Sequence, residues 1–125
     1  MKKAIVIPNA PAPIGPYSPA ILKNDTLYVS GQIPLNPSSG QLEVSSIESA
    51  TKQVMNNITA LIETAGFKMT DIVKCTIFLK SMDDFPKVNE VYGSYFTSEP
   101  PARETVQVAK LPMDVPIEIS CIAIK

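Results

Sequence analysis

Residues 100–110 read Pro-Pro-Ala-Arg-Glu-Thr-Val-Gln-Val-Ala-Lys, and this stretch predicts a rigid loop that leads into a β-strand. Proline has no N–H to give to a central strand, so Pro100 and Pro101 mark the place where the strand begins. Arg103 near its start can hold a carboxylate through two parallel hydrogen bonds, or it can pair with a neighbouring acid on the surface. The strand period of two defines two faces: Arg103, Thr105 and Gln107 share one, and Glu104, Val106 and Val108 share the other.

Strand patterns also occur elsewhere in the chain. Residues 8–19 hold five of the twelve prolines and predict a shaped loop that presents Tyr17. The loop is followed by a predicted hairpin whose turn is Asn24-Asp25. The expected strands are 4–7 (an edge strand), 20–23 and 26–30 (the hairpin), 71–80 and 117–124.

Apolar residues at helical spacing predict two amphipathic helices, over residues 46–65 and 85–96. Residues 45–48, Ser-Ser-Ile-Glu, form a capping-box pattern before the first helix, and Gly66 follows as its stop. Asp83-Asp84 are expected to cap the second helix. Asn89 lies on that helix, either as a solvated residue or as a half-buried one that needs partners. The expected buried stripe of the second helix is Val88, Val91, Tyr92, Tyr95 and Phe96.

Three residues stand out in their local patterns. Glu118 is a carboxylate in an almost wholly apolar strand, so it either faces water at an edge or lines a pocket. Gly31 follows Ser30 at the end of a strand, where the backbone needs an unusual conformation or another group approaches closely. Tyr17 on its stiff loop either walls a pocket or is a plain packing residue.

The composition narrows the classes of function. The chain has no histidine, which removes histidine-based nucleophile, metal and ribonuclease chemistry. Any proton transfer must therefore use carboxylates, Lys, Tyr, Cys or water. The net charge of −1 and the pI near 5.4 provide no basic field for nucleic acid. The two cysteines, Cys75 and Cys121, are expected to pack as small hydrophobic residues rather than to bind zinc.

Length and hydropathy indicate the kind of protein. The 125 residues fit a single domain, 1–125. We expect a cytosolic protein, because no apolar run is long enough for a membrane span and the short apolar segment after Lys3 is unlike a signal peptide. No nucleotide-binding motif occurs, and we expect no cofactor and no metal.

The order of the expected elements predicts an α+β fold, in which two helices pack on one face of one mixed β-sheet. The strands carry apolar residues on both faces, and a chain of this length has no third layer to cover the second face. We therefore expect a homo-oligomer that buries this face.

Taken together, the motifs resemble the Rid family, also called RidA or YjgF, the reactive-intermediate imine deaminases. The resemblance runs in order over nearly the whole chain, without large insertions. Its segments are Ile14-Gly15-Pro16-Tyr17-Ser18, Ser30-Gly31-Gln32-Ile33-Pro34, Gly66 with the strand to Leu79, Asp84-Phe85, Val88-Asn89-Glu90-Val91-Tyr92, Pro101-Ala102-Arg103, Val106 to Pro112 and Ile117-Glu118-Ile119.

The resemblance implies a chorismate-mutase-like fold and a homotrimer with three clefts between subunits. It implies cofactor-free hydrolysis of enamine and imine acids, such as 2-aminoacrylate, 2-iminopropanoate and 2-iminobutanoate, to 2-keto acids and ammonia. Arg103 would hold the substrate carboxylate, and Glu118 would position and activate water. The cleft would be lined by Tyr17, Ser30, Gly31, Asn89 and Thr105.

Two positions depart from the family pattern: Glu104 replaces a small residue, and Thr105 stands where many members have Cys. Alternation points Glu104 away from Arg103, and a charge there needs a partner or water. The main alternative function is a non-catalytic module that binds 2-keto acids or other small carboxylates at Arg103. An endoribonuclease, an older label attached to the family, conflicts with the missing histidines and the acidic pI.

Overall fold

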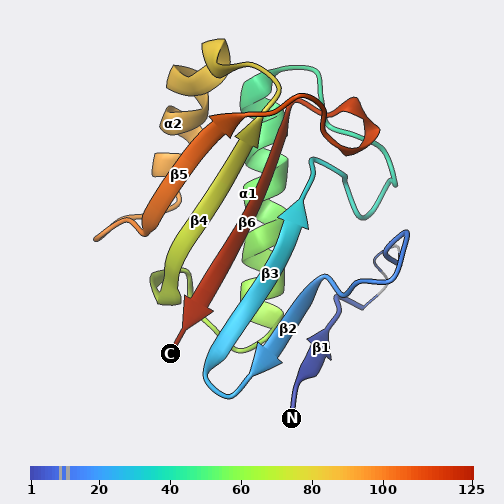
Figure 1. Ribbon diagram of the computed structural model, residues 1–125, viewed down its shortest axis with the longest axis vertical. Coiled ribbons are helices and arrows are strands. Elements are labelled where there is room, and N and C mark those ends of the chain that lie inside the picture. The colour runs from blue at the N-terminus through green and yellow to red at the C-terminus, as the bar shows by residue number, and fades with distance from the viewer. Residues whose placement is uncertain (9, 11) are drawn as a thin grey trace.

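The computed structural model describes residues 1–8, 10 and 12–125, so Asn9 and Pro11 of the expected proline-rich loop lie outside the described residues. The described residues form one sheet of six strands in the order β1-β2-β3-β6-β4-β5 (Figure 1). β5 runs parallel to β4 and the other neighbouring pairs are antiparallel, which confirms the prediction of a mixed sheet. The strands are Lys3–Ile5 (β1), Ala20–Lys23 (β2), Thr26–Gln32 (β3), Ile72–Leu79 (β4), Ala102–Gln107 (β5) and Ile117–Ile124 (β6).

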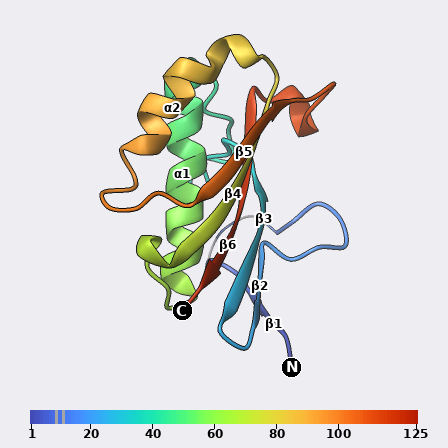
Figure 2. The same ribbon diagram turned by 60° about the vertical axis from the view of Figure 1, so that its left-hand side comes forward.

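Two helices, α1 (Ile47–Thr64) and α2 (Phe85–Gly93), cover the same face of the sheet, as predicted (Figures 1 and 2). α1 packs on β3 and β6, and α2 packs beside α1 near the β5 edge. No helix in the described part of the chain is long and apolar enough to cross a bilayer. The largest side chains of the core between helices and sheet include Val54, Ile58 and Leu61 of α1, Ile77 and Leu79 of β4, and Ile117 and Ile119 of β6.

The capping box of α1 lies one residue later than the sequence pattern indicated. Ser46, not Ser45, is the N-cap, and its hydroxyl accepts a hydrogen bond of 3.0 Å from the Ser49 N–H. The Ser49 hydroxyl in turn accepts from the Ser46 N–H at 3.2 Å, so Ser49 takes the place expected for Glu48. A short hydroxyl can close the box as well as a carboxylate because the two residues are only one turn apart.

The second helix is shorter than predicted and begins differently. α2 ends at Gly93 rather than at residue 96, since glycine weakens a helix and the Ser94 hydroxyl bonds the Val91 carbonyl at 2.6 Å. The side chain of Asp84 makes no capping bond. Instead, a short 3₁₀ turn, Met82–Asp84, leads into α2 and is capped by the Ser81 hydroxyl.

Strict strand alternation over residues 71–80 would place Val73 on the same face as Cys75, Ile77 and Leu79, but the structure does not. The pairing of β4 with β6 shifts between Ile72 and Lys74, which is the mark of a bulge. Ile72 is therefore buried and Val73 is 44% exposed. From Cys75 onward the alternation holds as expected.

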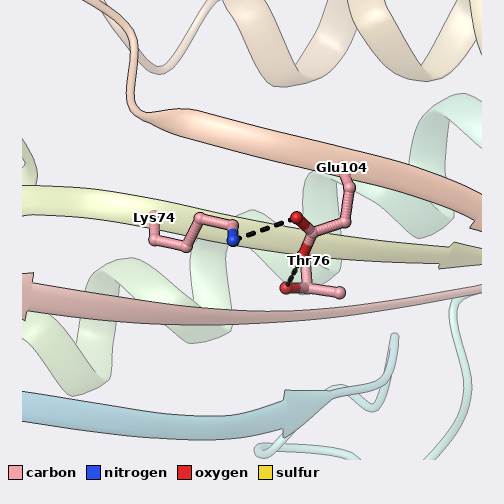
Figure 3. A network of polar contacts seen from close by, with 3 residues as sticks. All are labelled: Lys74, Thr76 and Glu104. Atoms are coloured by element: carbon pink, nitrogen blue, oxygen red, sulfur yellow. Dashed lines mark hydrogen bonds and ion pairs between the residues drawn. The ribbon is translucent and has the colours of Figure 1, made fainter.

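The sheet face away from the helices is partly apolar and open in the single chain. Tyr28 is 51% exposed, Val106 43% and Ile124 47%. The same face carries Glu104, whose carboxylate pairs with the Lys74 ammonium at 2.9 Å and accepts a hydrogen bond from the Thr76 hydroxyl at 2.6 Å (Figure 3). The partner that a charge at position 104 requires is thus supplied by the neighbouring strand.

Candidate active site

Arg103 lies on β5 and faces the helices. It sits in register with the buried Cys75 of β4, and its guanidinium carbon lies 5.0 Å from the ring centre of Tyr92 and 5.5 Å from that of Phe85, both on α2. Among the described residues, no carboxylate lies within ion-pair distance of this guanidinium. The structure therefore holds a half-buried arginine over two aromatic rings and gives it no acidic partner among the described residues.

Two other predicted site residues accompany Arg103. Asn89 lies on the α2 face between Phe85 and Tyr92, and Thr105 follows Arg103 on the same face of β5. The Asn89 Oδ1 and the Thr105 Oγ1 are buried without a hydrogen-bond partner in the described part of the chain. Buried polar atoms without partners are uncommon in folded proteins, and a group of them beside an unpaired arginine is typical of a binding site. We refer to Asn89, Arg103 and Thr105 as the anchor half-site.

The remaining predicted residues gather elsewhere, at one end of β3 and β6. A cavity of about 450 Å³ is lined by Tyr17, Ser30, Gly31 and Glu118, together with Ile14, Ile33 and Pro112. The Ser30 hydroxyl donates to the Ser18 carbonyl at 2.7 Å, which ties the loop that carries Tyr17 to β3. We refer to Tyr17, Ser30, Gly31 and Glu118 as the carboxylate half-site.

Gly31 is needed for the shape of this second half-site. A Cβ at position 31 would lie 2.6 Å from Cδ of Glu118, closer than real contacts allow. The expected close approach of another group to Gly31 is therefore confirmed, and that group is Glu118. Burial raises the pKa of the Glu118 carboxyl, which makes its ionised form a stronger base than a solvated carboxylate.

The two half-sites lie on opposite faces of the sheet. Arg103 is opposite Cys75 and Glu118 is opposite Phe78, and positions three apart on one strand point to opposite faces. β4 separates β5 from β6, so the two residues are about 10 Å apart across the sheet and about 10 Å apart along it. A small imino acid cannot touch both residues of one chain.

Sequence reasoning missed the aromatic surroundings of Arg103. The helical spacing predicts that Tyr92 is buried, and its 4% exposure confirms this, but the spacing predicts no role for Phe85. Their spacing with Asn89, at positions 85, 89 and 92, was the available signal, because residues three and four apart share a helix face. Their proximity to Arg103 depends on how α2 packs against β5, which spacing alone does not give.

The cysteines behave as expected of packing residues. Cys75 and Cys121 are free, buried and opposite each other in β4 and β6. Burial raises the pKa of both thiols, which disfavours the thiolate that metals and electrophiles require. The described residues contain no group of three or more His, Cys, Asp or Glu side chains that could hold a metal ion.

Comparison with known proteins finds relatives that match the whole length of this chain. A RutC family protein of Pyrococcus horikoshii is 49% identical over 125 residues, covering 100% of this chain and 99% of the relative. The 2-iminobutanoate/2-iminopropanoate deaminase of Escherichia coli is 43% identical over 128 residues, with 100% and 99% covered. A crystal structure from Thermotoga maritima superposes with a TM-score of 0.95 at 47% identity, covering 100% of this chain and 98% of that one. Residues 7–125 match the family described as Endoribonuclease L-PSP. The chain belongs to this family, which is also known as the YjgF/RidA family.

Proposed function

We propose that the protein hydrolyses small reactive imine and enamine acids, such as 2-iminopropanoate and 2-iminobutanoate, to 2-keto acids and ammonia. The observation that carries the proposal is the anchor half-site, in which the Arg103 guanidinium has no carboxylate partner among the described residues. A substrate carboxylate would supply that partner through two parallel hydrogen bonds. The similarity to a protein named as a 2-iminobutanoate/2-iminopropanoate deaminase supports the same substrate class.

The chemistry requires only water and a base. An iminium carbon is already electrophilic, so the water oxygen can bond to it while the C=N electron pair moves to nitrogen. Glu118, whose burial raises its pKa, takes the proton from water. It then returns this proton to the amino nitrogen, the C–N bond breaks, and ammonia leaves. The hydroxyl gives its proton to the Glu118 carboxylate as the carbonyl of the 2-keto acid forms.

Both half-sites would act on one substrate molecule only if two copies of the chain meet. The proposed assembly is a homotrimer, in which the anchor half-site of one subunit faces the carboxylate half-site of the next. Its support is the placement of Arg103 and Glu118 on opposite faces of one sheet. The open apolar face around Tyr28 and Val106 offers the surface that subunits would bury against one another.

A second candidate is a non-catalytic module that binds 2-keto acids, because the same unpaired Arg103 would hold any small carboxylate. The family description also includes the word endoribonuclease. The chain has no histidine and a net charge of −1, which gives neither a histidine general base nor a basic surface for RNA.

A coupled assay tests the proposal. A dehydratase or an amino-acid oxidase generates the imine in place, and semicarbazide traps what remains. We expect the wild-type protein to lower semicarbazone formation and both Arg103→Ala and Glu118→Gln to lose this effect. Arg103→Lys should recover little, because an ammonium cannot make the two-pronged contact.

The same variants separate the two candidates. If the wild type binds 2-keto acids but leaves every imine untouched, the protein is a binding module and the deaminase proposal fails. Retention of near wild-type rate by Arg103→Lys would contradict the bidentate contact.

A further inference from the structure

The guanidinium of Arg103 lies over two aromatic rings of one helix. Phe85 and Tyr92 are seven residues apart on α2, which corresponds to about 10.5 Å along the helix axis. The guanidinium carbon is 5.5 Å from the ring centre of Phe85 and 5.0 Å from that of Tyr92. Two residues seven apart lie two turns apart on the same face of the helix, so one guanidinium can contact both rings.

Aromatic faces and a carboxylate can hold a guanidinium at the same time. The ring quadrupole attracts the cation over the ring face, whereas the N–H donors of the guanidinium point outward in its plane. A guanidinium held over aromatic rings can therefore still offer N–H donors to a bidentate ligand. In the described part of the chain that edge is given no carboxylate, so the rings are the contacts that orient it.

The two rings are also more buried than aromatic side chains on a solvated surface. Tyr92 is only 4% exposed and Phe85 is partly buried against the core, so both rings have fixed positions. Cation–π attraction is stronger where water is excluded. Tyr92 packs against Phe96 with 5.0 Å between ring centres, which fixes it further from behind.

We infer that Phe85 and Tyr92 are positioning residues that orient the Arg103 guanidinium for bidentate capture of the substrate carboxylate. This role rests on the proposed carboxylate-binding function of Arg103. The ring of Tyr92 performs it and the hydroxyl does not, since the cation lies over the ring. The Tyr92 hydroxyl is buried without a hydrogen-bond partner in the described residues, and it is not needed for this contact.

The test measures binding of pyruvate or 2-oxobutanoate by calorimetry, with thermal melting of each variant. We expect Phe85→Leu and Tyr92→Leu to weaken keto-acid binding by about tenfold each, the loss of one partly desolvated cation–π contact. Tyr92→Phe keeps the ring and should bind within about twofold of the wild type on the same grounds. In turnover, KM should rise with little change in kcat, because the contact is present in both ground and transition states.

Two controls separate positioning from general damage. Tyr95→Leu is the matched aromatic change, because the Tyr95 hydroxyl donates to the Asn56 Oδ1 of α1 at 2.7 Å and the rings under the Arg103 guanidinium are those of Phe85 and Tyr92. It should leave keto-acid affinity unchanged. Pyruvamide, which has no carboxylate, should bind equally weakly to wild type, Phe85→Leu and Tyr92→Leu.

The inference is overturned if Tyr92→Phe weakens binding as much as Tyr92→Leu, since the hydroxyl would then be the important group. It is also overturned if Phe85→Leu, melting like the wild type, binds keto acids normally. Failure of the proposed function gives a different result: keto acids bind with the expected variant pattern, but no imine is hydrolysed. Should Tyr92→Leu not fold, Phe85→Leu and Tyr92→Phe still decide the outcome.

Discussion

Gly31 leaves space that the Glu118 side chain occupies. An added Cβ would lie 2.6 Å from Cδ of Glu118, and the end of that side chain can move more easily than backbone. We expect Gly31→Ala to displace the carboxylate and to lower kcat/KM by about 100-fold, in line with the loss of a well-placed general base. Stability should change by less than about 1 kcal/mol, because the residue lies at the exposed end of β3.

The control for this change is Gly93→Ala, where an added Cβ meets no atom within 4 Å. Its kcat/KM in the imine assay should equal that of the wild type. An active Gly31→Ala protein would show that Glu118 need not occupy the position seen here.

The raised pKa of Glu118 has a consequence for stability. The folded protein holds this proton to higher pH than the unfolded chain, whose carboxyl titrates near 4.5. The group's contribution to stability is therefore full below that value and is lost as pH rises through the folded pKa. Glu118→Gln should raise Tm at pH 7 and have little effect near pH 3, as measured by thermal melts at both values.

Glu104 is the matched control, because its pKa is shifted in the opposite direction. The hydrogen bond from Thr76 and the Lys74 ammonium lower its pKa, so its contribution is present above the unfolded value and lost as pH falls. Glu104→Gln should therefore lower Tm at pH 7. If both substitutions shift Tm in the same direction, the protonation states assigned to them are wrong.

At the scale of secondary-structure elements, the N-cap of α1 predicts that substitutions of two adjacent serines lower the free energy of unfolding by different amounts. Ser46→Ala removes the hydroxyl that accepts the Ser49 N–H and should cost about 1 kcal/mol in the free energy of unfolding. Ser45→Ala removes only an exposed 3.1 Å contact with the Ser49 hydroxyl and should cost a few tenths of that, about 0.3 kcal/mol. Urea denaturation of both variants measures the difference, and equal losses would place the cap at Ser45.

The elements themselves follow from local sequence, and their irregularities do not. Apolar spacing over residues 46–65 predicts α1 because a long periodic stripe has one helical solution, and Gly66 marks its end with φ of +82°. The bulge that buries Ile72 and exposes Val73 depends on the partner strand β6. The early end of α2 depends on the Ser94 hydroxyl competing for a helix carbonyl. The bulge in β4 and the early end of α2 depend on contacts that the spacing of apolar residues does not predict.

The division of the site depends on the strand order and is therefore a property of the whole molecule. All seven predicted site residues follow from motifs, but the motifs do not say that β4 lies between Arg103 and Glu118. The registers of β5 and β6 on β4 also place the Arg103 and Glu118 side chains on opposite faces of the sheet. Only the folded chain shows that the predicted site residues divide into two groups on opposite faces of the sheet.

A mixing experiment decides whether the half-sites of different copies work together. Arg103→Ala and Glu118→Gln are each expected to be inactive as pure proteins. If they are co-expressed in equal amounts with different tags and the doubly tagged species is isolated, some clefts will combine the intact Arg103 of one copy with the intact Glu118 of another. A mixed homotrimer holds two copies of one variant and one of the other, so one of its three clefts is restored and the isolated species should show about one third of the wild-type activity. Recovery on that order in the semicarbazide assay would show that the site is shared between copies. The two pure variants mixed without subunit exchange are the control, and an inactive mixed oligomer would mean that each chain needs its own Arg103 and Glu118.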